Sequence, residues 1–139
     1  MRRWIAALLC LALLWVPAGA VAGTPSDWAK AEVEQAVQAG LVPELTGDPA
    51  YQDALTREQF AQMMYNYAKF KGYDLTAGGD LTQFPDAGAI SDWAETALSW
   101  ANGKGLINGH ENGTIDPKGS TIRAQAARIM ANFDQNVAK

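Results

Sequence analysis

Apolar residues recur with a helical period in four stretches of the chain, and these stretches form two matching pairs. The first stretch, residues 27–40, has its apolar positions three or four residues apart, at Ala29, Val33, Ala36 and Val37. The third stretch, residues 92–105, repeats that spacing at Ala94, Ala97, Leu98 and Ala101. Ser or Asp can cap each of these helices, and Gly40 and Gly105 are typical of their ends. The pattern predicts two short, equivalent helices.

The second helix of each pair begins with a different kind of cap. Thr56 is followed three residues later by Gln59, the spacing of a capping box, and the apolar stripe behind it is Phe60, Met64, Tyr67 and Ala68. Ile122 holds the equivalent position in the later copy, so that helix either begins at Thr121 or lacks a cap worth about 1 kcal/mol. Its predicted stripe is Ala127, Met130 and Phe133.

Turn-forming residues separate the two helices of each pair. They are Pro43, Gly47 and Asp48-Pro49 in one copy, and Asn108-Gly109, Asn112-Gly113, Asp116-Pro117 and Gly119 in the other. Such residues favour extended, hairpin-like loops. Residues 72–83, with Gly78-Gly79, are predicted to be a linker or an exposed crossing between the pairs.

The two pairs are copies of one unit. Ser26-Asp27-Trp28-Ala29 returns 65 residues later as Ser91-Asp92-Trp93-Ala94. The stretches that begin at Arg57 and Arg123 both fit R-x-Q-x-A-x-x-M, and the distance from Trp to Arg is 29 residues in one copy and 30 in the other. A repeat fixes the architecture. We predict an all-α fold of tandem helix-loop-helix repeats.

The N-terminus has the three parts of a secretory signal. Arg2-Arg3 precede an apolar run from Trp4 to Val16, and small residues follow at Ala18, Ala20 and Ala22. We expect cleavage after Ala22 or Ala20, which divides the chain into a signal peptide (1–22), a first repeat (23–72), a linker (73–83) and a second repeat (84–139). The run is too short for a membrane span of about 20 residues, so we expect a secreted chain that is soluble after cleavage.

Cleavage would also change the composition. The single cysteine, Cys10, would be removed, which excludes disulfides and thiolate metal sites from the exported form. Loss of Arg2 and Arg3 would leave nine basic residues against fifteen acidic ones and move the formal charge from −4 to −6. An acidic chain of this kind is not expected to bind nucleic acid.

The order of these landmarks resembles the S-layer homology repeat of bacterial surface proteins. The second repeat carries nearly the whole pattern: Phe84-Pro85-Asp86, Trp93-Ala94, Gly105 to Gly109, Asn112-Gly113, Pro117 and Arg123-Ala124-Gln125. The first repeat keeps Trp28, Gly40 and Thr56-Arg57-Glu58-Gln59. The resemblance implies a pseudo-threefold bundle of three repeats whose grooves hold a secondary cell-wall polysaccharide, often pyruvylated. With two repeats, this chain is expected to form part of such a bundle at the cell wall or S-layer surface.

The candidate carbohydrate-binding residues are Trp28, Arg57, Trp93, Gly109, Gly113 and Arg123. An arginine in the first turn of a helix adds its fork of N–H donors to those of the helix end, which suits a sugar carboxylate. Tryptophan offers a flat apolar face to a sugar ring. The structural alternatives are that each arginine pairs with a nearby carboxylate or covers its own helix, and that each tryptophan packs in the core.

Other functions have less support in the sequence. The only histidine, His110, lies among turn formers as an expected solvent-exposed residue, and no nucleophile motif accompanies it, so we expect neither an enzyme nor a cofactor. Asn108 to Asp116 follow the early spacing of a calcium loop, but Gly119 stands where the bidentate Glu belongs. The stronger alternative is a secreted assembly module that completes its bundle by self-association or with other S-layer homology chains. Its contacts would come from Trp100 and from Tyr65, Tyr67, Phe70 and Tyr73.

Overall fold

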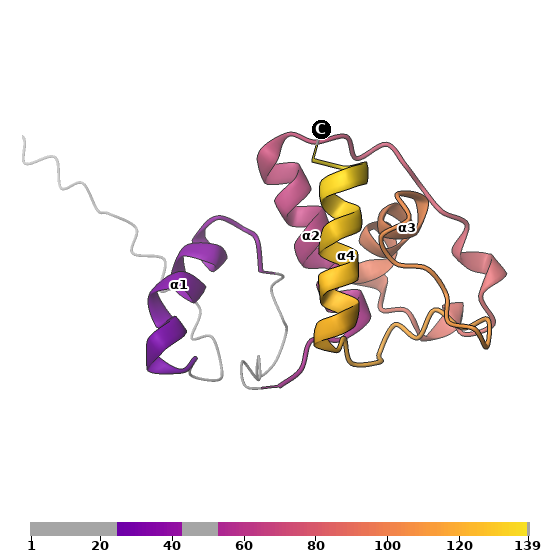
Figure 1. Cartoon of the computed structure of the whole chain (residues 1–139), viewed down its shortest axis with the longest axis horizontal. Helices are drawn as coiled ribbons and strands as arrows, with labels where there is room; N and C mark the ends of the chain where they lie inside the picture. The colour runs from indigo at the N-terminus through magenta and orange to yellow at the C-terminus, as the bar shows by residue number, and fades with distance from the viewer. Residues whose placement is uncertain (1–24, 43–52, 139) are drawn as a thin grey trace, which may run out of the picture.

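The computed structural model describes residues 25–42 and 53–138, so the predicted signal peptide and the turn residues Pro43 to Pro49 lie outside the described residues. The described chain is helical, as predicted (Figure 1). Its helices are α1 (Lys30–Gln38), α2 (Arg57–Lys71), α3 (Glu95–Gly103) and α4 (Arg123–Asn136). Four 3-10 turns accompany them, at Asp27–Ala29, Leu81–Gln83, Ala87–Ala89 and Asp92–Ala94. Over the described ranges, β pairing is confined to an isolated antiparallel bridge between Thr56 and Ser120.

The first helix of each repeat is terminated by the predicted glycine, which follows the last helical residue by two positions. Gly40 and Gly105 have φ angles of +67° and +69°, a left-handed conformation that other residues adopt only at a cost. The residue after each glycine donates back to the helix, with Leu41 N 2.9 Å from the Ala36 carbonyl and Leu106 N 2.8 Å from that of Ala101. These are the hydrogen bonds of a glycine C-cap.

The beginnings of these helices differ from the prediction. A 3-10 turn precedes α1 and another precedes α3, where side-chain caps were expected. In the second repeat the Ser91 hydroxyl donates to Glu58 Oε1 at 2.9 Å and accepts from the Lys118 ammonium, and it does not cap the helix. The Ser91 hydroxyl, which was expected to cap the helix, instead forms a tertiary contact with α2.

The N-terminal caps of α2 and α4 differ, as the sequence predicted. In α2 the Thr56 hydroxyl accepts from Gln59 N at 3.2 Å, and Gln59 Oε1 accepts from Thr56 N at 2.9 Å, which completes the capping box. In α4 the N-cap is Ile122, which has no acceptor, so the helix begins at Arg123 with half of the box. That half is the bond from Ile122 N to Gln125 Oε1, at 3.1 Å.

The core lies between α2, α3 and α4. Trp100 is 1% exposed, its ring stands edge-on to Tyr65 at a centroid distance of 5.5 Å, and its indole N–H donates to the Asp74 carbonyl at 3.2 Å. Phe133 of α4 packs against the same indole, with centroids 6.4 Å apart. Trp100 is therefore a core residue, and it is too deeply buried to make the intermolecular contacts expected for an assembly module.

Two predicted stripes are partly wrong. In α2 the buried apolar residues are Ala61, Met64 and Ala68, whereas Tyr67 is 41% exposed. In α4 Phe133 is buried as predicted, but Met130 is 52% exposed and Ile129 takes its place in the core. Periodicity gives the spacing of a stripe, but the face that is buried depends on where the neighbouring elements lie.

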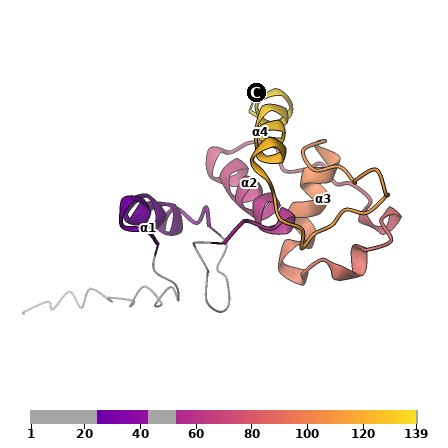
Figure 2. The same ribbon diagram turned by 60° about the horizontal axis from the view of Figure 1, so that its bottom comes forward.

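Helix α1 contributes nothing to this core. It lies apart from the other three helices (Figures 1 and 2), and none of its residues is buried. Trp28, in the 3-10 turn before it, is 85% exposed. Within residues 25–42 and 53–138, the first repeat thus contributes to the core through α2, which packs with the second repeat.

The predicted linker runs along α3 and is anchored to it. Gly79 N donates to the Ser99 carbonyl and the Ser99 hydroxyl donates to that of Gly79, both at 2.8 Å. Lys104 pairs with Asp74 at 2.8 Å. A Cβ atom on Gly103 would lie 2.8 Å from the Gly78 backbone, so glycine is needed for this close approach.

Candidate functional site

The first turn of α2 is hydrogen-bonded to the glycine-rich loop of the second repeat, which is residues 104–122 between α3 and α4. Arg57 N donates to the Gly119 carbonyl at 2.9 Å, and Glu58 N donates to that of Pro117 at 3.0 Å. These N–H groups have no partner within their own helix. The loop that follows α3 therefore caps a helix of the first repeat, and this joins the two repeats.

The guanidinium of Arg57 fixes the same loop from its other side. Nε donates to the Ile115 carbonyl at 2.8 Å and Nη2 donates to the Asn108 carbonyl at 2.7 Å, with the residue only 5% exposed. Burial lowers the pKa of Arg57 from its usual value, and the carboxylates of Asp116 and Asp86 oppose that shift. Five N–H donors give the guanidinium capacity for further acceptors beyond these two carbonyls.

Glu58 is buried beside Arg57 and ties α2 to the start of α3. It is 3% exposed and accepts from Ser91 N at 3.0 Å and from the Ser91 hydroxyl at 2.9 Å. The ammonium of Lys118, on the loop, pairs with the same carboxylate. A buried carboxylate is stable only with such partners, so Glu58 is a structural residue.

The Phe84-Pro85-Asp86 segment contacts the glycine-rich loop through Asp86 and Phe84. Asp86 accepts from Ile115 N at 2.9 Å and from Asp116 N at 2.8 Å. Desolvation raises the pKa of Asp86, but these backbone N–H groups outweigh it, so the pKa is lower than usual. Phe84 packs against Gly109, where a Cβ atom would come within 2.7 Å of the phenyl ring.

A cavity of about 150 Å³ lies between the first turn of α2, the loop and α4. Its lining comprises Arg57, Leu106, Ile107, Asn108, Gly109, His110, Gln125, Arg128 and Ile129. The two arginines come from different repeats, and Arg128 is exposed. With an amide and an imidazole beside two guanidinium groups, this cavity can bind a small anionic or hydroxyl-rich group.

His110 belongs to this cavity. It lies in the predicted turn, since its N–H donates to the Thr114 carbonyl at 2.8 Å and Gly113 beside it has a φ of +81°. Its side chain is only 34% exposed, so the expected solvent-exposed residue is instead half-buried. Nε2 is buried without a hydrogen-bond partner in the described part of the chain, and the nearest acid, Asp116 Oδ2, is 3.7 Å away. This nitrogen can therefore form a hydrogen bond with a ligand in the cavity.

The cavity brings together only some of the residues predicted from the sequence. Arg57 and Gly109 line it, whereas Trp28, Trp93, Gly113 and Arg123 do not. Trp93 is 46% exposed on the 3-10 turn before α3, and Arg123 is exposed in the first turn of α4.

The sequence prediction missed four polar residues of the lining: Asn108, His110, Gln125 and Arg128. Arg128 has Gln62 at the equivalent place in the first repeat, so comparison of the repeats gives no signal for it.

Two further properties concern the described residues only. Among residues 25–42 and 53–138 no group of three or more His, Cys, Asp or Glu side chains is placed to hold a metal ion. None of the helices in that part of the chain is both long and apolar enough to cross a membrane.

Comparison with known sequences gives one family and several relatives. Residues 83–127 match the family model of the S-layer homology domain. An amylopullulanase from Thermoanaerobacterium thermosulfurigenes is 33% identical over 105 residues, which is 75% of this chain and 6% of that protein. An endoglucanase from Bacillus sp. (strain KSM-635) is 29% identical over 113 residues, 81% of this chain and 12% of that protein. No solved structure matches significantly.

A surface-layer protein is a further relative of this chain. The surface-layer 125 kDa protein of Lysinibacillus sphaericus is 30% identical over 86 residues, 60% of this chain and 7% of that protein. The chain thus spans about a tenth or less of the length of most of these relatives. The matched domain contains α3, the glycine-rich loop and the first residues of α4, which form most of the cavity. Residues 83–127 of this chain are therefore an S-layer homology domain.

Proposed function

We propose that this protein attaches non-covalently to the bacterial cell wall by binding a secondary cell-wall polysaccharide. The observation that carries the proposal is the S-layer homology domain, whose loop and first residues of α4 provide most of the cavity described above. The ligand we infer is a sugar with a carboxylate, such as a pyruvate ketal.

The names of the relatives favour attachment to the cell wall, and not catalysis, as the function of the segment that they share with this chain. An amylopullulanase, an endoglucanase and a surface-layer protein have different roles by name, yet each shares only a small part of its length with this chain. A segment common to such different proteins is best explained by a location that they share. The catalytic activity of those enzymes is not proposed for this chain.

The chemistry of the cavity supports an anionic sugar. The guanidinium of Arg57 is committed to two loop carbonyls, so it contributes mainly charge and a rigid wall. Arg128 is exposed, and its fork of N–H groups can bind a carboxylate with two parallel hydrogen bonds. Gln125 and the unused Nε2 of His110 suit sugar hydroxyls.

The remaining candidates would contact more distant sugars. Trp93, with nearly half of its surface exposed, offers a stacking face, and Trp28 offers another on the separate α1 segment. Gly113 shapes the turn beside His110. Arg123 lies on the same helix as Arg128 but outside the cavity, which makes it a matched comparison.

The experiment is co-sedimentation of the chain, expressed with its whole sequence and purified after export, with cell walls before and after chemical removal of the secondary polysaccharide. We expect binding only to intact walls. Arg128→Ala should weaken that binding at least about tenfold, because a charge-assisted bidentate contact is worth more than 1.4 kcal/mol. Arg123→Ala makes the same charge change on the same helix and should bind nearly as wild type.

Each other outcome has a definite meaning. Loss of binding in Arg123→Ala alone would place the site at the first turn of α4, as the sequence suggested, and would contradict the cavity. Equal binding to stripped walls would exclude the polysaccharide. Binding should persist at physiological salt, where the repulsion between an acidic protein and an acidic glycan is screened beyond about 8 Å. A steep loss of binding between low and physiological salt would contradict this mode of recognition.

A further inference from the structure

The two repeats are equivalent in sequence, but their second helices are covered unequally. In α2, Ala61 and Met64 belong to the core and are 0% and 5% exposed. The equivalent residues of α4, 66 positions later, are Ala127 and Met130, and both are exposed, Met130 by 52%. Two positions that are buried on α2 are therefore uncovered on α4 in the described structure.

Helix α1 has an apolar face that no other described element covers. The buried residues of α3 and of the 3-10 turn before it include Ala94, Leu98 and Ala101, each at most 1% exposed. Their equivalents, 65 positions earlier, are Ala29, Val33 and Ala36, which are also apolar, yet no residue of α1 is buried. An amphipathic helix of this kind gains stability by covering its apolar stripe.

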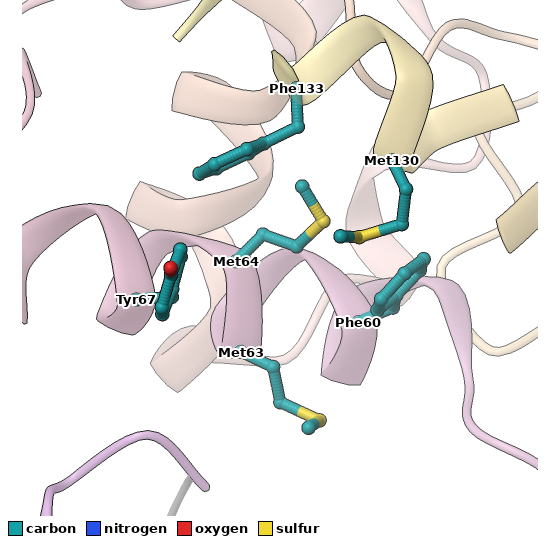
Figure 3. A pocket seen from close by; sticks show the side chains of 6 residues that line it. All are labelled: Phe60, Met63, Met64, Tyr67, Met130 and Phe133. Atoms are coloured by element: carbon teal, nitrogen blue, oxygen red, sulfur yellow. The ribbon is translucent and has the colours of Figure 1, made fainter. Parts of the chain in front are cut away.

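An open apolar groove lies beside the uncovered face of α4. It has a volume of about 210 Å³ and is lined by Phe60, Met63, Met64, Tyr67, Met130 and Phe133. Figure 3 shows the ends of Met64 and Met130 approaching each other across the groove, with Phe133 on one side and Phe60 on the other. Methionine side chains adapt readily to an incoming apolar surface.

The charges around the two surfaces are opposite in sign. The exposed charged residues of α2 and α4 are Lys69, Lys71, Arg123, Arg128 and Asp134, a balance of +3. Those of α1 and its 3-10 turn are Asp27, Lys30, Glu32 and Glu34, a balance of −2. Opposite balances favour association of α1 with the face formed by α2 and α4.

We propose that α1 of one copy docks on α4 and the methionine-rich groove of a second copy, and that the exchange is reciprocal. The occupant is a second copy because α1 of the same chain lies apart from α4, and the residues that follow it reach α2 instead: Asn66 Nδ2 donates to the Leu41 carbonyl at 3.5 Å. Reciprocal exchange of one helix closes a twofold dimer without leaving a free face. This inference does not depend on wall binding.

Sedimentation velocity of the exported full-sequence chain over a range of concentrations tests the proposal. We expect wild type to have twice the mass of the chain. Val33→Glu on α1 and Met130→Glu on α4 each place a charge in the proposed contact and should raise the dimer dissociation constant at least about tenfold. Both sites are accessible in the single chain, so the fold should persist, which circular dichroism checks.

Phe70→Glu is the matched control. Phe70 is 62% exposed on α2 and does not line the groove, so the same change there should leave the dimer intact. A mixture of Val33→Glu and Met130→Glu chains should recover association, because one of the two helix contacts in the mixed pair is unmodified. A wild type that remains monomeric, or a Phe70→Glu variant as defective as the other two, would overturn the proposal.

Discussion

Arg57 and Arg123 occupy equivalent positions in the two repeats, so Arg→Ala at each makes a matched pair of variants. Arg57 is 5% exposed and donates to two loop carbonyls at 2.8 and 2.7 Å, whereas Arg123 is exposed in the first turn of α4. Hydrogen bonds from a charged group are worth about 1.5–3 kcal/mol each. Arg57→Ala should therefore lower the free energy of unfolding by about 3–5 kcal/mol, and Arg123→Ala by less than about 0.5 kcal/mol.

Urea unfolding measures the difference. Trp100 is buried against Tyr65 and Phe133 and should report loss of the core by its fluorescence. With a slope of about 1–3 kcal/mol per molar urea, the expected loss moves the midpoint of Arg57→Ala by one molar or more, or leaves that variant unfolded.

A conservative variant keeps the test informative in that case. Arg57→Lys retains the charge but loses the planar fork, and should lie between wild type and Arg57→Ala. If Arg57→Ala unfolded at the same urea concentration as Arg123→Ala, the claim that Arg57 fixes the glycine-rich loop would be refuted.

Three other changes test single contacts. Ile122→Thr supplies the missing hydroxyl cap of α4 at a residue that is already 60% exposed, and should stabilise the fold by about 0.5–1 kcal/mol in thermal unfolding; a lower melting temperature would contradict this account of the cap. Gly109→Ala brings a Cβ atom within 2.7 Å of Phe84 and should cost about 1–3 kcal/mol, whereas Gly88→Ala, with nothing within 4 Å, should be nearly neutral; equal effects would count against the close contact. Because the pKa of Asp86 is lowered in the folded state, its contribution to stability is present above the unfolded pKa of about 3.9 and is lost as pH falls through the lower folded pKa. Acid titration should accordingly show a shallower loss of stability in Asp86→Asn than in wild type, and identical slopes would exclude this contribution.

Local chemistry accounts for the features that the sequence predicted correctly. Gly40 and Gly105 terminate α1 and α3 because a left-handed residue is needed just after each helix, and the capping box of α2 needs only residues three apart. The all-α class follows from helical periodicity repeated in both copies, and the family from the landmarks around Trp93 and Arg123.

The burial of equivalent residues could not be predicted in the same way. Met64 and Met130 have the same place in the repeat and similar neighbours in sequence, yet one is 5% and the other 52% exposed. The difference arises because Met64 lies within the core formed by α2, α3 and α4, whereas no described helix covers Met130. A repeated motif therefore predicts equal local structure but not equal surroundings.

The sequence by itself determined the helices, their ends, the repeat and the family, since each depends on residues within a few positions of one another or on their order. Only the tertiary structure decided which arginine is buried, that Ser91 serves Glu58 and not its own helix, and that Arg128 and His110 line one cavity. Those contacts join residues 18 to 71 positions apart. Their partners are chosen by the packing of α2 against the second repeat, and no local pattern records that packing.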